Sequence, residues 1–179
     1  MKKKLLILFL LIAIGFYWDV YAEGKNGFYI ENNNTYYYIN GEIQKGITKI
    51  GEDYYFLGEN TGRVVTGWVT SIINGKTYYA NKDGKLVDGF QTISGTKYYF
   101  SPEDYSLQKG IKQIGEDYYF LGENTGRVVT GWVTSIINGE TYYANKDGKL
   151  VDGFQTISGT KYYFSPEDYS LQKGVKQIG

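Results

Sequence analysis

The chain contains a block of 64 residues written twice with almost no change. Residues 51–114 and 115–178 differ at two places, where Lys76 and Ile111 of the first block become Glu140 and Val175 in the second. A fixed period of this kind is the signature of a repeat architecture. Because a duplicated block duplicates any site that it carries, the pattern favours a multivalent binding protein over an enzyme with one catalytic centre.

A shorter repeat lies inside the block. A glycine followed by a large apolar residue, here called a marker glycine, recurs about every 21 residues, at Gly27-Phe28, Gly46-Ile47, Gly67-Trp68, Gly89-Phe90, Gly110-Ile111, Gly131-Trp132, Gly153-Phe154 and Gly174-Val175. A run of tyrosines, such as Tyr78-Tyr79, lies between successive markers. The chain therefore contains about seven units, three in each block.

Each unit has the composition of a β-hairpin. Tyrosine and phenylalanine favour strands, and each aromatic run is followed by turn residues such as Asn81-Lys82-Asp83-Gly84. We expect a short second strand after the turn, as at Lys85-Leu86-Val87. No segment of 23–179 has sustained helical periodicity, so the sequence predicts an all-β fold. Because a lone hairpin is marginal in water, the hairpins must stack into a solenoid.

Alternation along the strands predicts which side chains face the interior. Tyr54 and Phe56 share one face of their strand and should be buried, with Tyr55 on the other face in the groove between hairpins. The first tyrosine of each doublet, as at Tyr78 and Tyr98, is likewise expected in the core. The marker glycine should allow the backbone to approach the next unit closely, because it has no Cβ.

The first residues predict a secretory signal peptide over 1–22. Three lysines precede the apolar stretch Leu5–Phe16, and Val20-Tyr21-Ala22 matches the small-x-small pattern before a cleavage site. The stretch is shorter than the roughly 20 apolar residues of a membrane-spanning helix. We expect cleavage after Ala22, a secreted repeat domain over 23–179, and no lipid anchor because cysteine is absent. An uncleaved N-terminal anchor is the alternative.

Composition excludes several classes of function. Basic and acidic residues number 19 each, so no positive field is available for nucleic acid or an anionic membrane. The chain has no histidine and no cysteine, which removes the usual nucleophile–base pairs and zinc sites. Adjacent carboxylates such as Glu52-Asp53 point to opposite faces of a strand and read as turn residues rather than a glycosidase pair. We therefore expect no enzyme activity, no cofactor and no metal site.

The pattern Gly67-Trp68, Gly75-Lys76-Thr77-Tyr78-Tyr79, Asp83-Gly84-Lys85 and Gly89-Phe90 resembles the bacterial cell-wall-binding repeat family. That family includes choline-binding modules and the C-terminal repetitive oligopeptides of clostridial toxins. The resemblance covers about residues 27–179. It implies a left-handed solenoid of stacked β-hairpins, about three per turn, which would place Trp68 and Trp132 one turn apart on the same side.

The resemblance also implies ligand sites between consecutive hairpins. It assigns ligand binding to the aromatic residue after a marker glycine and to the second tyrosine of a doublet, namely Trp68, Trp132, Phe90, Phe154, Tyr55, Tyr79, Tyr99, Tyr119, Tyr143 and Tyr163. Choline-binding members have a further tryptophan before the doublet, where this chain has Asp53, Thr77, Lys97 and their copies. A quaternary ammonium ion bound there would contact one aromatic ring fewer than in those members, so choline is an alternative rather than the favoured ligand. Trp68 and Trp132 could instead cover the seam between hairpins.

We predict a secreted, non-catalytic module, either free or associated with the cell wall, that binds a surface polymer multivalently. The polymer would be cell-wall carbohydrate, teichoic acid or a host glycan. The alternative is a structural repeat protein that binds protein, including itself. The chain stops at Gly179, where the next tyrosine strand should begin, and an uncapped solenoid end predicts a homodimer formed end to end.

Overall fold

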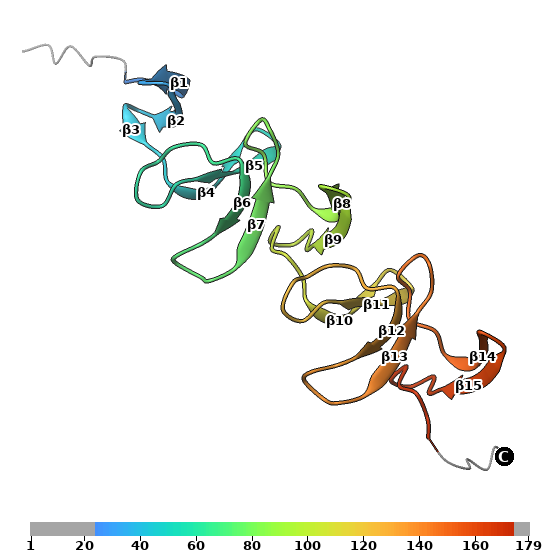
Figure 1. Ribbon diagram of the computed structural model, residues 1–179. Helices are drawn as coiled ribbons and strands as arrows, with labels where there is room; N and C mark the ends of the chain where they lie inside the picture. The colour runs from blue at the N-terminus through green and yellow to red at the C-terminus, as the bar shows by residue number, and fades with distance from the viewer. Residues whose placement is uncertain (1–23, 174–179) are drawn as a thin grey trace, which may run out of the picture.

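The computed structural model describes residues 24–173, which form an elongated row of β-hairpins (Figure 1). This part of the chain contains fifteen strands and no helix. The predicted signal peptide, its cleavage site and the C-terminal end proposed for dimerisation lie outside the described residues. The strands are β1 Gly27–Glu31, β2 Asn34–Ile39, β3 Glu42–Ile43, β4 Gly46–Ile50, β5 Asp53–Leu57, β6 Gly67–Thr70, β7 Thr77–Ala80, β8 Gly89–Ile93, β9 Thr96–Phe100, β10 Gly110–Ile114, β11 Asp117–Leu121, β12 Gly131–Thr134, β13 Thr141–Ala144, β14 Gly153–Ile157 and β15 Thr160–Phe164.

The strands pair with their neighbours in sequence. β1, β2 and β3 form a three-stranded sheet, and the other twelve strands form six two-stranded antiparallel hairpins from β4–β5 to β14–β15. Figure 1 shows the three hairpins of β4–β9 and the three hairpins of β10–β15 repeating one arrangement along the row. The predicted all-β solenoid of hairpins is confirmed.

The two strands that pair in each hairpin are not the two that the sequence predicted. The marker-glycine strand pairs with the tyrosine strand that follows it, with Gly67 opposite Ala80 and Trp68 opposite Tyr79. The expected second strand at 85–87 makes only one bridge to the tyrosine strand, between Ala80 and Leu86. The segment does not form a ladder with the tyrosine strand, because its backbone hydrogen bonds are divided between two hairpins.

These short segments after each tyrosine strand, here called tails, join the hairpins together. The N–H of Leu86 donates to the carbonyl of Tyr54 in the preceding hairpin at 2.7 Å, whereas that of Val87 donates to Tyr79 in its own hairpin at 3.1 Å. Backward bonds of 2.7 to 2.9 Å occur in six successive tails, from Val64, Leu86, Leu107, Val128, Leu150 and Leu171. Each hairpin is therefore tied to the one before it through the backbone, independently of side-chain identity.

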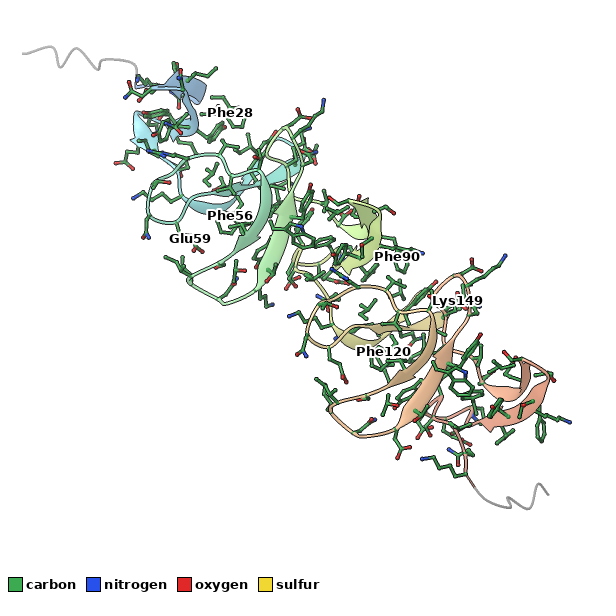
Figure 2. The ribbon with its side chains drawn as sticks, in the orientation of Figure 1. Phe28, Phe56, Glu59, Phe90, Phe120 and Lys149 are labelled. Atoms are coloured by element: carbon green, nitrogen blue, oxygen red, sulfur yellow. The ribbon has the colours of Figure 1, made fainter. Side chains whose placement is uncertain are left out.

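The buried core runs along the row at the register position opposite each marker glycine. Leu57, Ala80 and Phe100 occupy this position in the first block and are fully buried. Phe56 and Phe120 add a second buried layer at equivalent places in the two blocks (Figure 2). Fully burying such a side chain stabilises by roughly 1.5–3 kcal/mol, and the neighbouring hairpins supply this burial.

The prediction that Tyr54 is buried is wrong, and Tyr55, predicted to lie in the groove between hairpins, is the buried member of the doublet. Tyr55 is only 8 % exposed, and it shares a face with the buried Leu57, whereas Tyr54 is only half-buried. The reason is register: β5 has one more residue between its tyrosine doublet and the position opposite the marker glycine than β7 has. Both faces of β5 are covered as a result.

The prediction that marker glycines allow a close backbone approach is also wrong at Gly67. A Cβ built there would meet no atom within 4 Å. Gly67 has a φ of +79°, which L-residues adopt at a cost of roughly 1–2 kcal/mol. Glycine is required by the backbone turn into the strand. At the turn residue Gly84, by contrast, a larger side chain is excluded by crowding, because a Cβ would lie 2.2 Å from Val64 Cγ1 of the preceding tail.

These two glycines predict different losses of stability on substitution by alanine. Gly67→Ala should cost about 1–2 kcal/mol from strain alone, whereas Gly84→Ala adds overpacking and should cost about 2–5 kcal/mol in total. Urea unfolding followed by circular dichroism measures both values. Equal losses would contradict the assignment of crowding to Gly84.

Candidate functional site

Trp68 on β6 lies at the centre of a group of aromatic rings. Its ring centroid is 5.1 Å from that of Tyr79 on β7 and 4.9 Å from that of Tyr98 on β9 in the next hairpin. The buried Phe100 lies 5.8 Å away. We call these four residues the Trp68 cluster. Held on several sides, the indole still has 43 % of its surface exposed, so it forms a fixed platform open to solvent.

Two threonine hydroxyls lie on the same face as this platform. Thr70 follows Trp68 by two residues on β6, and Thr77 precedes Tyr79 by two on β7, so alternation places all four side chains on one face. The two Oγ1 atoms are 3.1 Å apart. One hydroxyl donates to the other, which leaves one O–H and several lone pairs to face solvent.

The second block repeats the arrangement. Trp132 is again 43 % exposed, and Thr134 and Thr141 lie 3.2 Å apart between their Oγ1 atoms. The Trp132 cluster has centroid separations of 5.1 Å to Tyr143, 4.9 Å to Tyr162 and 5.8 Å to Phe164. The molecule thus carries two equivalent platforms, one block apart along the row.

The hairpins with phenylalanine after the marker glycine are built differently. Phe90 packs against Tyr99 of its own hairpin at 4.9 Å and Tyr119 of the next at 5.0 Å between centroids. The ammonium of Lys97 lies over the Phe90 ring, 4.2 Å from its centroid. In the second block Lys161 lies 4.6 Å from the centroid of Phe154, which also packs against Tyr163 at 4.8 Å. The chain's own lysines therefore occupy the cation position at these rings.

The structure reassigns the tyrosine that accompanies each tryptophan. The resemblance assigns ligand binding to second tyrosines such as Tyr99, but the tyrosine of the next hairpin that packs against Trp68 is Tyr98, and Tyr99 packs against Phe90. Tyr98 had been assigned to the core. Phe100 lies opposite the marker glycine, and side chains alternate along β9, so Tyr98 shares the face of Phe100 and Tyr99 lies on the other face. Alternation counted from Phe100 would therefore have assigned the two tyrosines to different faces.

Tyr55 and Tyr119 lie beneath aromatic residues of the preceding hairpin. Tyr55 is 5.2 Å from Phe28 and Tyr119 is 5.0 Å from Phe90, between ring centroids, and both tyrosines are buried. They form floors under those rings rather than open walls. The roles assigned to them in ligand binding remain predictions, as do those of the other eight candidate residues.

A polar cleft of about 500 Å³ lies between the turn of β6–β7 and the loop after β9. Lys76 and Asp104, both among its lining residues, form an ion pair of 2.6 Å. No aromatic ring lines the cleft, so it lacks a platform for stacking. We therefore place the candidate site at the two tryptophan clusters.

The Asp104 carboxyl has a shifted pKa. Burial alone would raise it, but hydrogen bonds from Lys76 Nζ and from the hydroxyl and N–H of Ser106 outweigh burial and hold the pKa well below its usual range. The same hydrogen bond raises the pKa of Lys76. The pair is therefore fully ionised at neutral pH.

Within residues 24–173, no group of three or more histidine, cysteine, aspartate or glutamate side chains is arranged to hold a metal ion. The same residues include no helix with the length and apolar character needed to cross a membrane.

Comparison with known proteins agrees with this architecture. The family model described as a putative cell wall binding repeat matches residues 66–86, 88–102, 130–150 and 152–166. The chain carries cell wall-binding repeats. The matched segments contain the hairpins β6–β7, β8–β9, β12–β13 and β14–β15, so they include both tryptophan clusters and both phenylalanine–lysine pairs.

Similar repeats occur in larger proteins. Glucosyltransferase-S of Streptococcus mutans is 32 % identical over 84 % of this chain, and toxin A of Clostridium novyi is 31 % identical over 74 %. The alignments span 10 % and 6 % of those proteins. The crystal structure of choline binding protein F from Streptococcus pneumoniae, solved with a peptidoglycan analogue, superimposes with a TM-score of 0.73 at 27 % identity, covering 83 % of this chain and 52 % of that one. The repeats here are thus similar in sequence to segments of the glucosyltransferase and the toxin, and similar in fold to choline binding protein F.

The Lys76–Asp104 pair predicts a pH-dependent contribution to stability. The pKa of Asp104 is lower in the folded chain than its unfolded value of about 3.9, so the pair stabilises the fold above that pH and loses its effect as the pH falls through the folded pKa. Lys76→Gln should therefore raise the pKa of Asp104 and lower stability at pH 7, with the difference from wild type shrinking below about pH 4. NMR titration and urea unfolding measure the two effects.

Glu140→Gln is the matched control, because Glu140 holds the same position in the second block and makes no ion pair with any residue of 24–173. This control should leave the titration of Asp104 unchanged. An unshifted Asp104 in Lys76→Gln would show that the lysine is not responsible.

Proposed function

We propose that this chain is a non-catalytic module that binds a surface glycan through the Trp68 and Trp132 clusters. The observation that carries the proposal is the pair of identical tryptophan platforms, each beside two threonine hydroxyls. A sugar ring has an apolar C–H face and an edge of hydroxyls. The indole provides the surface for the first, and Thr70 and Thr77 provide donors and acceptors for the second.

Multivalency supports binding to a polymer rather than to a single small molecule. Each site is shallow, since nearly half of the tryptophan surface is exposed to solvent. A single shallow site binds its ligand weakly. A polymer that reaches both clusters binds the second at high effective concentration, which raises the overall affinity by about 10²–10⁴ when the spacing allows.

The relatives support a surface polymer as the partner. Choline binding protein F was crystallised with a peptidoglycan analogue, and the aligned repeats recur in glucosyltransferases and a toxin. On this proposal the protein is secreted or associated with a cell wall, and cell-wall carbohydrate, teichoic acid and host glycan are the candidate polymers. The predicted signal peptide over 1–22 fits this location.

Choline is a second candidate ligand, because the chain has the fold of a choline binding protein. Two features of the aromatic clusters oppose choline binding. Lys97 and Lys161 already lie over Phe90 and Phe154, so a quaternary ammonium would meet a like charge there. At Trp68 the residue that would supply a further ring is Thr77, which reduces the cation–π attraction available.

Substitution of the tryptophans tests the glycan proposal. Trp68→Ala and Trp132→Ala should each weaken pelleting of the purified protein with isolated Gram-positive cell walls, and the double variant should lose the avidity gain of about 100-fold or more. Ile30→Ser is the control, because Ile30 is highly exposed and lies outside both clusters. A double variant with a native circular dichroism spectrum that still pellets like wild type would contradict the proposal.

Competition separates the two ligands. If the glycan proposal holds, soluble wall fragments release the bound protein, whereas millimolar choline does not. Lys97→Ala with Lys161→Ala should increase the affinity for choline, because the substitutions remove the cations over Phe90 and Phe154. Release of the wild type by choline would favour the second candidate.

A further inference from the structure

Two pairs of isoleucines point into solvent on the turns of equivalent hairpins. Ile72 and Ile73 are 70 % and 79 % exposed on the turn of β6–β7, and Ile136 and Ile137 are 70 % and 78 % exposed on that of β12–β13. We call residues 71–76 and 135–140 the isoleucine turns. Two exposed isoleucines side by side form a contiguous apolar patch on each turn, and such patches favour an interaction site.

Hydrogen bonds beneath the isoleucines hold each turn in shape. In the first turn the Glu59 carboxylate accepts from the buried Ser71 hydroxyl at 2.6 Å and from the N–H of Ile72 at 2.7 Å. Asn74 Nδ2 donates to the hydroxyl of Tyr78 at 2.9 Å. Figure 2 shows Glu59 next to the hairpin that carries this turn. The second turn has the same bonds, so both apolar tips are presented preorganised.

The two turns differ in one residue, and that residue reverses the charge. Lys76 lies at the base of the first turn, where its carbonyl accepts from the N–H of Ser71. Its side chain is about half exposed, with the ammonium 2.6 Å from Asp104. Glu140 occupies the same position in the second turn, and its side chain is exposed. This is the only change of charge between the two 64-residue blocks.

We propose that two copies of this chain associate side by side, in antiparallel orientation, through the isoleucine turns. Both turns lie on the same side of the row, one block apart (Figure 1). A two-fold axis between them places the first turn of each copy on the second turn of its partner, which makes two equivalent contacts. Each contact joins isoleucine to isoleucine and Lys76 to Glu140.

Charge selects this orientation over the parallel one. Parallel copies would place Glu140 against Glu140, neither of which has an ion pair within residues 24–173, and like charges across an interface oppose association. Antiparallel copies place Glu140 against Lys76, whose ammonium keeps N–H donors available beside Asp104. The antiparallel pairing also brings a cation to Glu140, whose block lacks the lysine that pairs with Asp104 in the other block. The second copy is thus the partner whose surface is complementary to both turns.

Charge reversal tests the proposal through sedimentation velocity of the purified protein. We expect concentration-dependent dimers at tens of micromolar, an affinity in keeping with a small interface (~10–100 µM). Glu140→Lys alone, which leaves the Lys76–Asp104 pair intact, should raise the dimer dissociation constant about tenfold or more, because both contacts then join like charges. Lys76→Glu alone should do the same, with its circular dichroism spectrum checked because it also removes that pair. The double variant Lys76→Glu with Glu140→Lys restores opposite charges at both contacts and should dimerise within about twofold of wild type.

Ile73→Ser with Ile137→Ser should abolish the dimer while leaving the circular dichroism spectrum unchanged, because both side chains are exposed. A strictly monomeric wild type would overturn the proposal and leave the isoleucine turns for another partner. Dimers insensitive to all of these substitutions would also overturn it and would favour association at another surface, such as the chain end. Failure here is distinguishable from failure of glycan binding, because the single charge variants retain both tryptophan clusters.

Discussion

Within residues 24–173 the buried clusters join side chains of neighbouring hairpins, as Phe56 packs with Tyr78, and the structure depends on how each hairpin is attached to the one before it. The attachment is a backbone hydrogen bond from a tail, reinforced by rings that cross the same boundary. Because a two-stranded ribbon is marginal in water, burial between neighbours supplies what the single unit lacks. Stability in such a row accumulates junction by junction rather than in one central core.

The same junctions create the candidate site. Trp68 belongs to one hairpin and Tyr98 to the next, so the platform exists only where two units meet. Phe90 lies at a junction of the same kind, yet its ring is capped by Lys97. One scaffold therefore carries open and occupied aromatic clusters, and the difference rests on the residue after the marker glycine and the residue before the tyrosines.

The period, the turn chemistry and the absence of helical patterning were enough to predict an all-β row of about seven hairpins. The sequence did not show which residue of each tyrosine strand lies opposite the marker glycine. The doublets Tyr54-Tyr55 and Tyr78-Tyr79 look equivalent, but they stand at different distances from the residue opposite the marker glycine, so their side chains exchange faces. The tails could not be recognised either, because their bonds reach across a unit boundary that local patterns do not reveal.

The connection from tail to preceding hairpin is strictly between nearest neighbours. Leu171 donates to Thr141 as Leu107 donates to Thr77, so the end of one block presents the same backbone surface as the end of the other. Insertion or deletion of 64 codons in register would therefore create no unfamiliar junction. Genetic recombination between the near-identical blocks could lengthen or shorten the molecule, and adjust its reach and the number of its tryptophan platforms, without any compensating mutation.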